Sequence, residues 1–476
     1  SMVRYLLSKL LLIEASLMLI PVIVAFIYHE DIRVINSLVI TIGMLVIIGL
    51  LGVAFKPKNY HVYTKEGLLI VALCWILWSF FGALPFVLSG QIPSIIDAFF
   101  EMVSGFTTTG ATIVPDVAVL SHSLLFWRSF AHLIGGMGVL VFALAIMENS
   151  KNSHLEVMRA EVPGPVFGKV VSKLKETAQI LYVIYLSMFA ILVVILMVAG
   201  MPAFDSVITA MGCAGTGGFG VYNDSIAHYN SSLITNIVSI AVLLFGINFN
   251  LYYFLLLRKF KAFFKDEELR TYIGIVMIAT ALIWLNVSGL YPSTGKALEN
   301  SLFEVANVMT TTGFGVTDLT VWPLFAQVIL LFLMFVGGSA GSTAGGIKVM
   351  RTLILTKIAR NQVLSTLYPH RIMTIHINEQ PLDKEIQHGV LKYLTLYVFL
   401  LLGLTLMLSL DNNNFMVVVS AATSTFNNIG PMLGTSQTFA IFSPFSKLLM
   451  SFAMIAGRLE IYPMLLLFIP RTWSKY

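Results

Sequence analysis

Apolar segments of about twenty residues recur along the whole chain, and each is long enough to cross the roughly 30 Å hydrocarbon core of a lipid bilayer. Of the 476 residues, 57% are hydrophobic and 11% are charged, whereas a soluble chain carries about 25% charged residues. A chain this apolar cannot cover its folded surface with polar side chains. We therefore predict an all-α polytopic membrane protein embedded in the lipid bilayer. Soluble enzymes, nucleic-acid-binding proteins and secreted disulfide scaffolds are excluded.

The apolar segments follow a regular order. Two leading spans are predicted near residues 5–28 and 35–55, followed by a basic stretch from Lys56 to Lys65. After it, the chain shows four times a long apolar segment, a shorter half-apolar segment ending in a turn rich in Thr, Gly and Asn, and another long segment. The long segments lie near residues 66–88, 121–147, 178–200, 232–257, 270–290, 323–357, 389–410 and 438–468. The sequence thus predicts ten spans and four short segments.

The four short segments can be aligned with one another. Phe100–Gly110 and Phe303–Gly313 carry Phe-Glu and Thr-Thr-Thr-Gly at identical offsets. We align Gly217 of the second copy and Gly430 of the fourth copy with the last glycine of these two segments. A repeat of about one hundred residues, seen four times, indicates four quasi-equivalent units.

The units divide the chain into five parts. Each unit contains two spans, an even number, so all four enter the membrane in the same direction and can surround one axis as parallel helix/pore-loop/helix repeats. The predicted parts are residues 1–60 (two leading helices), 61–150 (unit 1), 151–265 (unit 2), 266–362 (unit 3, with a broken last helix) and 363–476 (unit 4).

Basic residues predict the orientation of these units. With the N-terminus in the cytoplasm, most of the 29 Lys and Arg residues lie on the inner side. The outer side then carries only Arg33, Arg128, Lys296 and Lys447, while Arg458 lies within a span. This distribution obeys the positive-inside rule, so all four Thr/Gly turns enter from the outer face.

The four turns have the composition of an ion filter. Irregular backbone is tolerated at membrane depth only where protein buries it or where it lines a water-filled path. Glycine permits positive φ, so successive carbonyl groups can face one way, and Thr hydroxyls add uncharged oxygen ligands. Any one turn alone could be a helix cap, but four in register favour a filter that replaces the hydration shell of an ion. The predicted ion-contacting residues are Thr108, Thr109, Gly110, Gly215, Thr216, Gly217, Thr311, Thr312, Gly313, Asn428, Ile429 and Gly430.

Glycines also interrupt the last span of unit 3, in a run from Gly337 to Lys348. Each glycine costs a helix about 1 kcal/mol relative to Ala, so we expect a flexible intramembrane loop beneath the filter. The alternative is a close helix-packing face of the small-xxx-small kind. The predicted gate residues in this run are Gly337, Gly338, Gly341, Gly345, Gly346 and Lys348.

Charged residues occur at three positions of interest inside the predicted spans and pore segments. Arg458 lies well inside the last span, where a charge costs at least roughly 2.5 kcal/mol and usually faces a cavity or a partner. It could face the pore and hold the glycine run by hydrogen bonds, or it could snorkel or pair with Glu460. Glu101 and Glu304 lie nine residues before Gly110 and Gly313. We expect them to stabilise or cap the pore segments and do not assign them as ligands.

These motifs resemble the TrkH/TrkG/KtrB superfamily of potassium uptake proteins, most closely its TrkH type with two extra leading spans. The resemblance covers the whole chain and rests on the four filter segments, the Gly337–Lys348 run and Gly457-Arg458-Leu459-Glu460. It implies a homodimer in the bacterial inner membrane, with one pore per subunit and K⁺ held by filter carbonyls. It also implies that the run and Arg458 form a gate, and that a cytoplasmic nucleotide-binding subunit of the TrkA type controls it.

The resemblance and the repeats together favour gated, selective uptake of K⁺. Within this superfamily a serine in place of the first filter glycine goes with sodium permeation, and position 110 is Gly. The alternative is a secondary transporter that couples K⁺ to Na⁺ or protons, although such proteins favour inverted repeats and ionisable residues at the midplane. No enzymatic motif is present, so we expect no catalytic residues and no cofactor beyond the transported K⁺. The polar interval 358–388 is expected to shape the surface where a partner docks.

Overall fold

The computed structural model describes residues 2–57, 64–138, 174–368 and 374–473 of the chain. The regular elements of the described part are helices, apart from one antiparallel pair of two-residue strands, β1 (His376–Ile377) and β2 (Gln380–Pro381). The predicted helical class is confirmed. Lys58, Lys169, Lys173 and His370 lie outside the described residues, as does the end of the predicted span 121–147.

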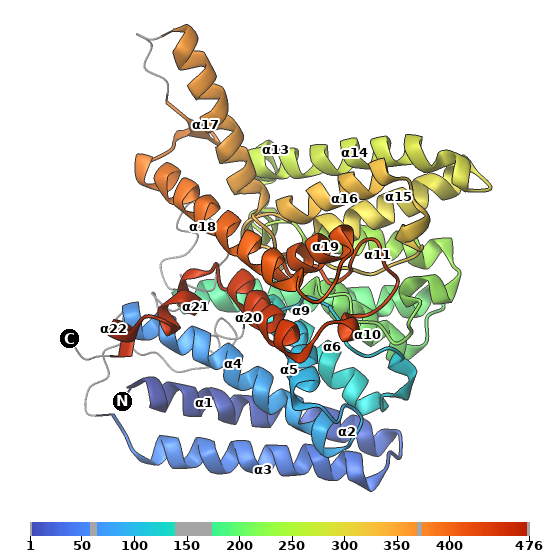
Figure 1. Ribbon diagram of the computed structural model, residues 1–476, viewed down its shortest axis with the longest axis vertical. Helices are drawn as coiled ribbons and strands as arrows, with labels where there is room; N and C mark the ends of the chain where they lie inside the picture. Colours follow the sequence, from blue (N-terminus) through green and yellow to red (C-terminus); the bar gives the residue numbers. More distant parts are fainter. Residues whose placement is uncertain (1, 58–63, 139–173, 369–373, 474–476) are drawn as a thin grey trace.

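A leading hairpin forms one side of the molecule. It consists of α1 (Met2–Leu17), α2 (Leu19–Ile27) and α3 (Ile32–Ala54), at the bottom of Figure 1. The Asp31 side chain accepts a hydrogen bond from the Arg33 N–H and so caps α3. A Cβ atom on Gly52 would lie 2.7 Å from Cβ of Ser8, so the small residues allow α1 and α3 to approach closely.

The predicted four units follow the hairpin in order. Each has a long helix, a short helix, an irregular loop and a second long helix that is interrupted or ends early. The helices are α4 (Thr64–Leu88), α5 (Ile95–Phe106) and α6 (His122–Gly136) in unit 1; α9 (Leu174–Val198), α10 (Ala203–Gly215), α11 (Ser232–Phe245) and α12 (Phe249–Leu256) in unit 2; α14 (Glu267–Val287), α15 (Thr294–Met309), α16 (Leu324–Val336) and α17 (Val349–Leu367) in unit 3; α18 (Lys384–Leu408), α19 (Phe415–Phe426), α20 (Pro444–Arg458) and α21 (Tyr462–Leu467) in unit 4.

Shorter elements connect these helices. A 3₁₀ turn follows the irregular loop in every unit: η1 (Val117–Val119), η2 (Ser225–Tyr229), η4 (Leu319–Val321) and η5 (Phe439–Ile441). The remaining short elements are α13 (Phe260–Lys265), η3 (Ser288–Leu290) and α22 (Pro470–Trp473). The recurrence of the turn extends the fourfold repeat beyond the motif visible in the sequence.

Several of the ten predicted spans are not continuous helices. Six helices of the described residues are long and apolar enough to cross a membrane, and α11 with α12, bent by 90°, raises this number to seven. The protein is therefore a multi-pass membrane protein. The helix of unit 3 is interrupted between α16 and α17, that of unit 4 between α20 and α21, and α6 ends at Gly136.

The sequence predicted an interruption only in unit 3, yet the second helices of units 2 and 4 are also interrupted. Glycines allow the broken helices to lie against the pore segments. A Cβ atom on Gly135 would collide with the carbonyl oxygen of Phe106, and one on Gly457 with that of Phe426. Units 1 and 4 thus use the same contact at the end of their short helices.

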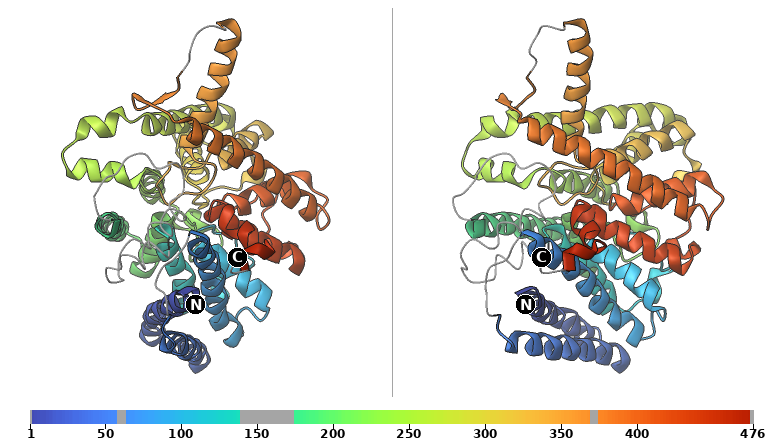
Figure 2. Two further views of the ribbon diagram at one scale, coloured as in Figure 1. Left: turned by 90° about the vertical axis from the view of Figure 1, so that its left-hand side faces the viewer. Right: turned by 60° about the vertical axis from the view of Figure 1, so that its left-hand side comes forward.

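The far end of the molecule is formed by α17, which projects from the bundle opposite the leading hairpin (Figures 1 and 2). Its base is fixed by the N-terminus of α14. Lys357 on α17 forms an ion pair with Glu267, and the Asn378 side chain between β1 and β2 donates to Asp266 at 2.8 Å. The predicted polar interval thus includes part of α17 and this small hairpin.

Candidate functional site

The short helices α5, α10, α15 and α19 each end where one of the four irregular loops begins. We call residues 107–110, 215–218, 310–313 and 427–430 the filter loops. The C-terminal end of a helix carries a partial negative charge, which favours a cation beside it. Three of these helices begin with a side-chain cap, from Ser94, Ser293 and Asn414. Each cap fixes where its helix starts.

One backbone conformation recurs in all four filter loops. In each loop a residue with positive φ is followed two positions later by a glycine with positive φ. The pairs are Thr108 (φ 55°) with Gly110 (77°), Thr216 (51°) with Gly218 (77°), Thr311 (56°) with Gly313 (84°), and Asn428 (58°) with Gly430 (107°). Non-glycine residues rarely adopt positive φ, so a fourfold repetition indicates four equivalent structures.

The filter loops form a closed ring. A Cβ atom on Gly110 would collide with the carbonyl oxygen of Gly217, and one on Gly218 with that of Thr312. The ring continues from unit 3 to unit 4, because Gly313 faces the carbonyl of Ile429 in the same way. It closes where a Cβ atom on Gly430 would lie 2.6 Å from the carbonyl oxygen of Thr109. Glycine is required at these positions by both the φ angle and the lack of space.

The backbone corrects the predicted alignment of unit 2. Gly218, not Gly217, has the conformation of Gly110, Gly313 and Gly430, and Gly217 takes the place of Thr109. The run Gly215-Thr216-Gly217-Gly218 allows either alignment when only the glycine is matched. The following residue was the missed signal, because Gly218-Phe219 repeats Gly313-Phe314. Gly218 therefore joins the candidate residues of the filter.

Several of the predicted side-chain ligands are bonded within the scaffold. The hydroxyl groups of Thr109 and Thr107 are 2.8 Å apart, as are those of Thr312 and Thr310. The hydroxyl of Thr311 accepts from the N–H of Gly345 at 2.6 Å. Since these hydroxyls bind protein groups, the backbone carbonyls are the stronger candidates for ion contact.

Asn428 connects units 4 and 1. Its side-chain N–H₂ donates to Thr109 Oγ1 at 3.0 Å and to the carbonyl of Met454 at 2.9 Å. Asn428 thus braces the filter where units 4 and 1 meet. Its place in a glycine-rich turn of the sequence did not predict this role.

Glu101 and Glu304 hold the chain that leaves the filter. Glu101 accepts from the N–H of Ile113 at 3.0 Å, and Glu304 accepts from the N–H of Val316 at 3.1 Å. The two contacts have the same offset in units 1 and 3. Glu101 also forms a buried ion pair with Arg128, at 3.3 Å between Oε1 and Nη1. Of the two predicted roles, these contacts favour stabilisation, because each carboxylate ties its short helix to the chain that follows the filter loop.

The chain between α16 and α17 forms a compact loop, which we call the gate loop (residues 337–348). Its ends are joined, because the N–H of Ile347 donates to Phe335 and the N–H of Lys348 donates to Val336, at 3.0 and 2.9 Å. Four of its residues have positive φ: Gly337, Gly341, Gly346 and Lys348. The predicted interruption of the helix is confirmed, and a continuous small-xxx-small packing face is excluded.

The gate loop lies directly against two filter loops. A Cβ atom on Gly345 would collide with the carbonyl oxygen of Asn427 and lie 3.2 Å from Cβ of Asn428. With the bond from Gly345 to the Thr311 hydroxyl, this residue contacts both unit 3 and unit 4. Among the predicted gate residues, Gly345 thus contacts two filter loops directly.

The broken helix of unit 2 supports the same loop. The carbonyl of Gly246 accepts from the N–H of Ser339 at 3.0 Å, and the N–H of Phe249 donates to the carbonyl of Gly341 at 3.1 Å. A Cβ atom on Gly341 would lie 2.8 Å from Oδ1 of Asn248. The 90° bend between α11 and α12 thus leaves backbone groups available for the gate loop.

Arg458 joins the gate loop to unit 1. Its Nη1 donates to the carbonyl of Thr343 at 2.7 Å, and its Nη2 donates to the carbonyls of Gly135 and Gly136 at 2.5 and 2.6 Å. The latter carbonyls belong to the last two residues of α6, and that of Gly135 also accepts from the N–H of Gly138 at 3.0 Å. Arg458 therefore holds the glycine run by a hydrogen bond, as one of the predicted alternatives has it, and Glu460 pairs with Arg351 at 2.5 Å.

Glu268 on α14 joins the gate loop to the first turn of α17. One oxygen, Oε1, accepts from the N–H of Ala340 at 2.6 Å and from the N–H of Met350 at 3.1 Å. Met350 belongs to the first turn of α17, so a single carboxylate spans the interruption. Sequence reasoning missed Glu268, because nothing in its own segment indicates a contact with a loop about seventy residues away.

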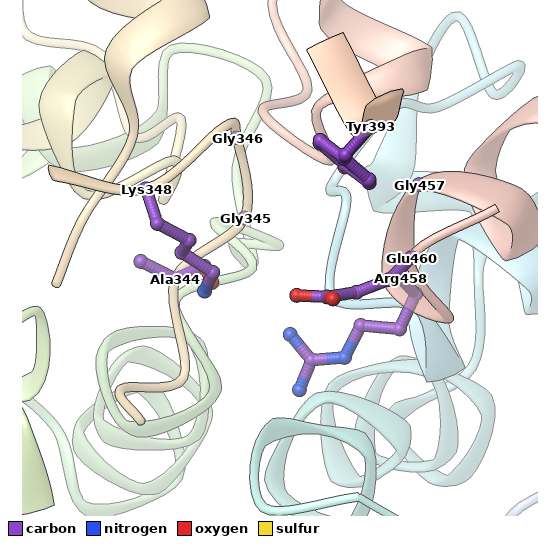
Figure 3. Close-up of a pocket in the computed structure, with 8 residues that line it drawn as sticks. All are labelled: Ala344, Gly345, Gly346, Lys348, Tyr393, Gly457, Arg458 and Glu460. Atoms are coloured by element: carbon purple, nitrogen blue, oxygen red, sulfur yellow. The ribbon is translucent and has the colours of Figure 1, made fainter. Parts of the chain in front are cut away.

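A small pocket lies between the gate loop and the end of α20. Figure 3 shows Lys348 and Arg458 entering it from opposite sides, with Glu460 beside Arg458. Lys348 donates to the carbonyl of Ala344. The pocket is also lined by Gly345, Gly346, Tyr393 and Gly457. The gate loop and the end of α20 thus enclose a pocket that two cationic side chains, Lys348 and Arg458, border.

Comparisons with known proteins agree with this arrangement. A family model described as cation transport protein, TrkH, matches residues 35–475. The chain is 33% identical to the Trk system potassium uptake protein TrkH of Salmonella typhimurium over 98% of both chains. It is 31% identical to the Trk system potassium uptake protein TrkG of Escherichia coli, covering 96% of this chain and 95% of that one. The crystal structure of the potassium transporter TrkH from Vibrio parahaemolyticus matches with a TM-score of 0.89 and 31% identity over 99% of both chains.

Proposed function

The chain belongs to the TrkH family of cation transport proteins, and on this basis we propose that it takes up potassium ions by gated, selective conduction through the ring of filter loops. The observation that carries the proposal is the ring itself. Four loops with one repeated backbone conformation contact one another in the order 1, 2, 3, 4 and back to 1. Such a ring presents carbonyl oxygens from four sides, which is the arrangement that replaces the hydration shell of a cation.

The ligands in this proposal are backbone carbonyls of the predicted filter residues, extended by Gly218. A ring of uncharged dipoles favours a monovalent cation that sheds its water readily. Four neighbouring helix C-termini add partial negative charge around the ring. The name of the curated relatives, potassium uptake protein, supports K⁺ as the transported ion.

The gate in this proposal is the loop 337–348 together with Arg458. The loop lies against two filter loops, and Arg458 binds it to the end of α6. A cation beyond the filter repels another cation, so Arg458 adds an electrostatic barrier to the steric one. Conduction requires that the loop leave this position.

We place the protein in the bacterial inner membrane with a cytoplasmic N-terminus, as the distribution of basic residues favours. In this orientation the filter opens to the outside, and α17 and the hairpin around Asn378 lie on the cytoplasmic side. The proposed partners are a second copy of the chain and a cytoplasmic nucleotide-binding subunit of the TrkA type. The resemblance to the family supports both.

The alternative is a secondary transporter that couples K⁺ to Na⁺ or protons. The fourfold parallel repeat and the closed ring favour conduction, because coupled transporters more often use inverted repeats around a central site.

Potassium uptake by bacteria that lack their own uptake systems tests the proposal. Cells producing this chain with a TrkA-type subunit are expected to grow at limiting K⁺ and to accumulate Rb⁺, while cells with an empty vector do not. Growth equal to that of the vector control, with the protein present in the membrane, contradicts the proposal. Uptake that disappears when the Na⁺ or proton gradient is removed at constant membrane potential would favour the coupled transporter.

A further inference from the structure

The filter loop of unit 2 lacks the side chains that brace the loops of units 1 and 3. In those units two threonines pair through their hydroxyl groups behind the loop. The pairs are Thr107 with Thr109 and Thr310 with Thr312, with oxygen atoms 2.8 Å apart in each. The equivalent positions in unit 2 are Gly215 and Gly217, which have no side chain. Something else must therefore support this quarter of the ring.

The imidazole ring of His132 occupies the vacant space. His132 lies on α6 and is fully buried, with 0% of its surface exposed. A Cβ atom on Gly217 would lie 2.5 Å from Cγ and Nδ1 of this ring and 2.6 Å from Cδ2. A Cβ atom on Gly215 would lie 2.7 Å from the carbonyl carbon of His132. A side chain at either position would therefore collide with His132, so both positions require glycine.

Both nitrogen atoms of the His132 ring are hydrogen-bonded, one to unit 1 and the other to unit 2. Nδ1 lies 2.7 Å from the carbonyl oxygen of Gly105, in the last turn of α5. Since a carbonyl only accepts, Nδ1 carries the proton, and Nε2 is free to accept from the N–H of Phe219 at 3.4 Å. A single neutral tautomer satisfies both contacts. His132 thereby joins the pore helix of unit 1 to the residue that follows Gly218.

The Phe219 side chain extends this support. Its ring stacks on His132 at 4.4 Å between centroids, and the guanidinium group of Arg128 lies over the ring at 3.8 Å. Arg128 in turn pairs with Glu101, which holds the chain leaving the filter loop of unit 1. Filter loops 1 and 2 are therefore connected through one buried set of contacts.

We propose that His132 is a positioning residue for ion selectivity, whose ring replaces in unit 2 the threonine pair that braces the filter loops of units 1 and 3. The inference rests on the proposed function, since it concerns selectivity of the same filter. The carbonyl of Gly217 lies against Gly110, so a displacement of loop 2 changes the distance between carbonyls of neighbouring units. Discrimination between K⁺ and Na⁺ depends on these distances and on the rigidity of the ring.

The inference can be tested by removing the side chain at position 132 and adding one at position 217, separately and together. We would measure the ratio of K⁺ to Na⁺ permeability in liposomes for the native chain, His132→Ala, Gly217→Thr and the double variant. His132→Ala removes the brace. We expect it to lower the permeability ratio roughly fivefold, because about one net hydrogen bond is lost. Gly217→Thr alone collides with the ring and is expected to lower it as well. The double variant places the threonine where the ring was, so its ratio should exceed that of both single variants.

Two further variants make the result specific. His132→Asn keeps a donor for Gly105 but loses the ring, so it should lower the ratio less than His132→Ala. Leu124→Ala removes a fully buried side chain, 0% exposed, eight residues before His132 on the same helix. It is expected to lower the thermal stability without changing the ratio. This control separates loss of packing in α6 from loss of the brace.

The outcomes distinguish the inference from the proposed function. If the native chain shows no preference for K⁺, the proposed function itself fails. A native ratio favouring K⁺ that is unchanged in His132→Ala, or a double variant no better than Gly217→Thr, overturns the inference alone. If His132→Ala does not fold, the comparison of the double variant with Gly217→Thr and the result for His132→Asn still decide it.

Discussion

At the scale of single residues, the site depends on places where no side chain fits. The backbone of the filter glycines has positive φ, and the neighbouring loop fills the space where a Cβ atom would be. The two requirements are independent, so substitution there is costly in two ways. Other glycines of the chain, such as Gly220, meet neither requirement, since the atoms nearest to a Cβ there lie at 3.8 Å or more.

Gly218 gives the first prediction, because it was identified from the backbone and not from the sequence. Gly218→Ala places a methyl group against the carbonyl of Thr312 and forces alanine into left-handed backbone, which costs roughly 1–2 kcal/mol before the collision is counted. We expect a lower temperature of unfolding in detergent and a lower ratio of K⁺ to Na⁺ permeability. Gly220→Ala is the matched control. Equal behaviour of the two variants would show that unit 2 does not take part in the ring as described.

Arg458 gives the second prediction. Its guanidinium donates to three carbonyls, one on the gate loop and two at the end of α6. Hydrogen bonds to a charged group contribute about 1.5–3 kcal/mol each. Arg458→Gln removes the charge and most of these bonds, so the basal flux of K⁺ without the regulatory subunit should rise several-fold. Arg458→Lys, which keeps the charge but not the geometry, should lie between. A flux equal to that of the native chain in both variants would contradict the role of Arg458 in closing the path.

At the scale of elements, the interruptions of the second helices form one layer under the filter. The gate loop of unit 3 contacts the bend between α11 and α12. Arg458, at the end of α20, binds both this loop and the end of α6. Backbone groups freed by one interruption are thus satisfied by groups at another. Irregular backbone is tolerated inside a membrane where protein groups satisfy its hydrogen bonds, and these contacts do so.

Shortening the gate loop tests this layer. Removal of two residues between Gly341 and Gly346 withdraws Gly345 from Thr311 and Asn427, the contacts that close the path below the filter. We expect a higher basal flux with unchanged preference for K⁺, because the filter loops themselves are intact. The same two-residue deletion in the loop between α19 and η5, within Thr435–Gln437, controls for a general loss of order. Unchanged or lower flux would count against the gate assignment.

The sequence predicted the element order well and the interruptions poorly, for a physical reason. Hydropathy reports whether a segment lies in lipid, and this property is the same for a straight and a bent span. The gate loop was predictable because five of its residues are glycines, whereas the bend at Gly246 contains one and depends on contacts with unit 3. The misplaced glycine of unit 2 has a different origin. Matching the glycine alone leaves two alignments open, and the correct one requires that Phe219 also be matched to Phe314.

At the scale of the whole molecule, the gate is connected to a surface far from the filter. Three consecutive acidic residues at the N-terminus of α14 make this connection. Glu268 binds the gate loop and the first turn of α17, Glu267 pairs with Lys357 further along this projecting helix, and Asp266 accepts from Asn378 in the small hairpin. A partner that moves α17 or the hairpin therefore acts on a rigid point directly beside the gate loop.

Replacement of the hairpin tests whether the regulatory subunit docks there. We would exchange residues 374–382 for a Gly-Ser linker of equal length and measure binding of a TrkA-type subunit to the purified protein. The account predicts weaker binding of the subunit and a preserved K⁺ preference. A linker of equal length in the loop after the filter of unit 4, on the opposite face, serves as control. Binding equal to that of the native chain would remove the polar interval 358–388 from the docking surface.

The central claim is that four loops form one selective filter, and cation flux into liposomes tests it most directly. K⁺, Rb⁺ and Na⁺ would be compared under an imposed membrane potential without any other gradient, for the native chain and for Gly110→Ser. The serine side chain would meet the carbonyl of Gly217, so the variant disturbs the contact between units 1 and 2 without adding charge. The account predicts that K⁺ and Rb⁺ flux exceed Na⁺ flux in the native chain and that the substitution weakens this preference. Flux that requires a Na⁺ or proton gradient, or a preference unchanged by the serine, would contradict it.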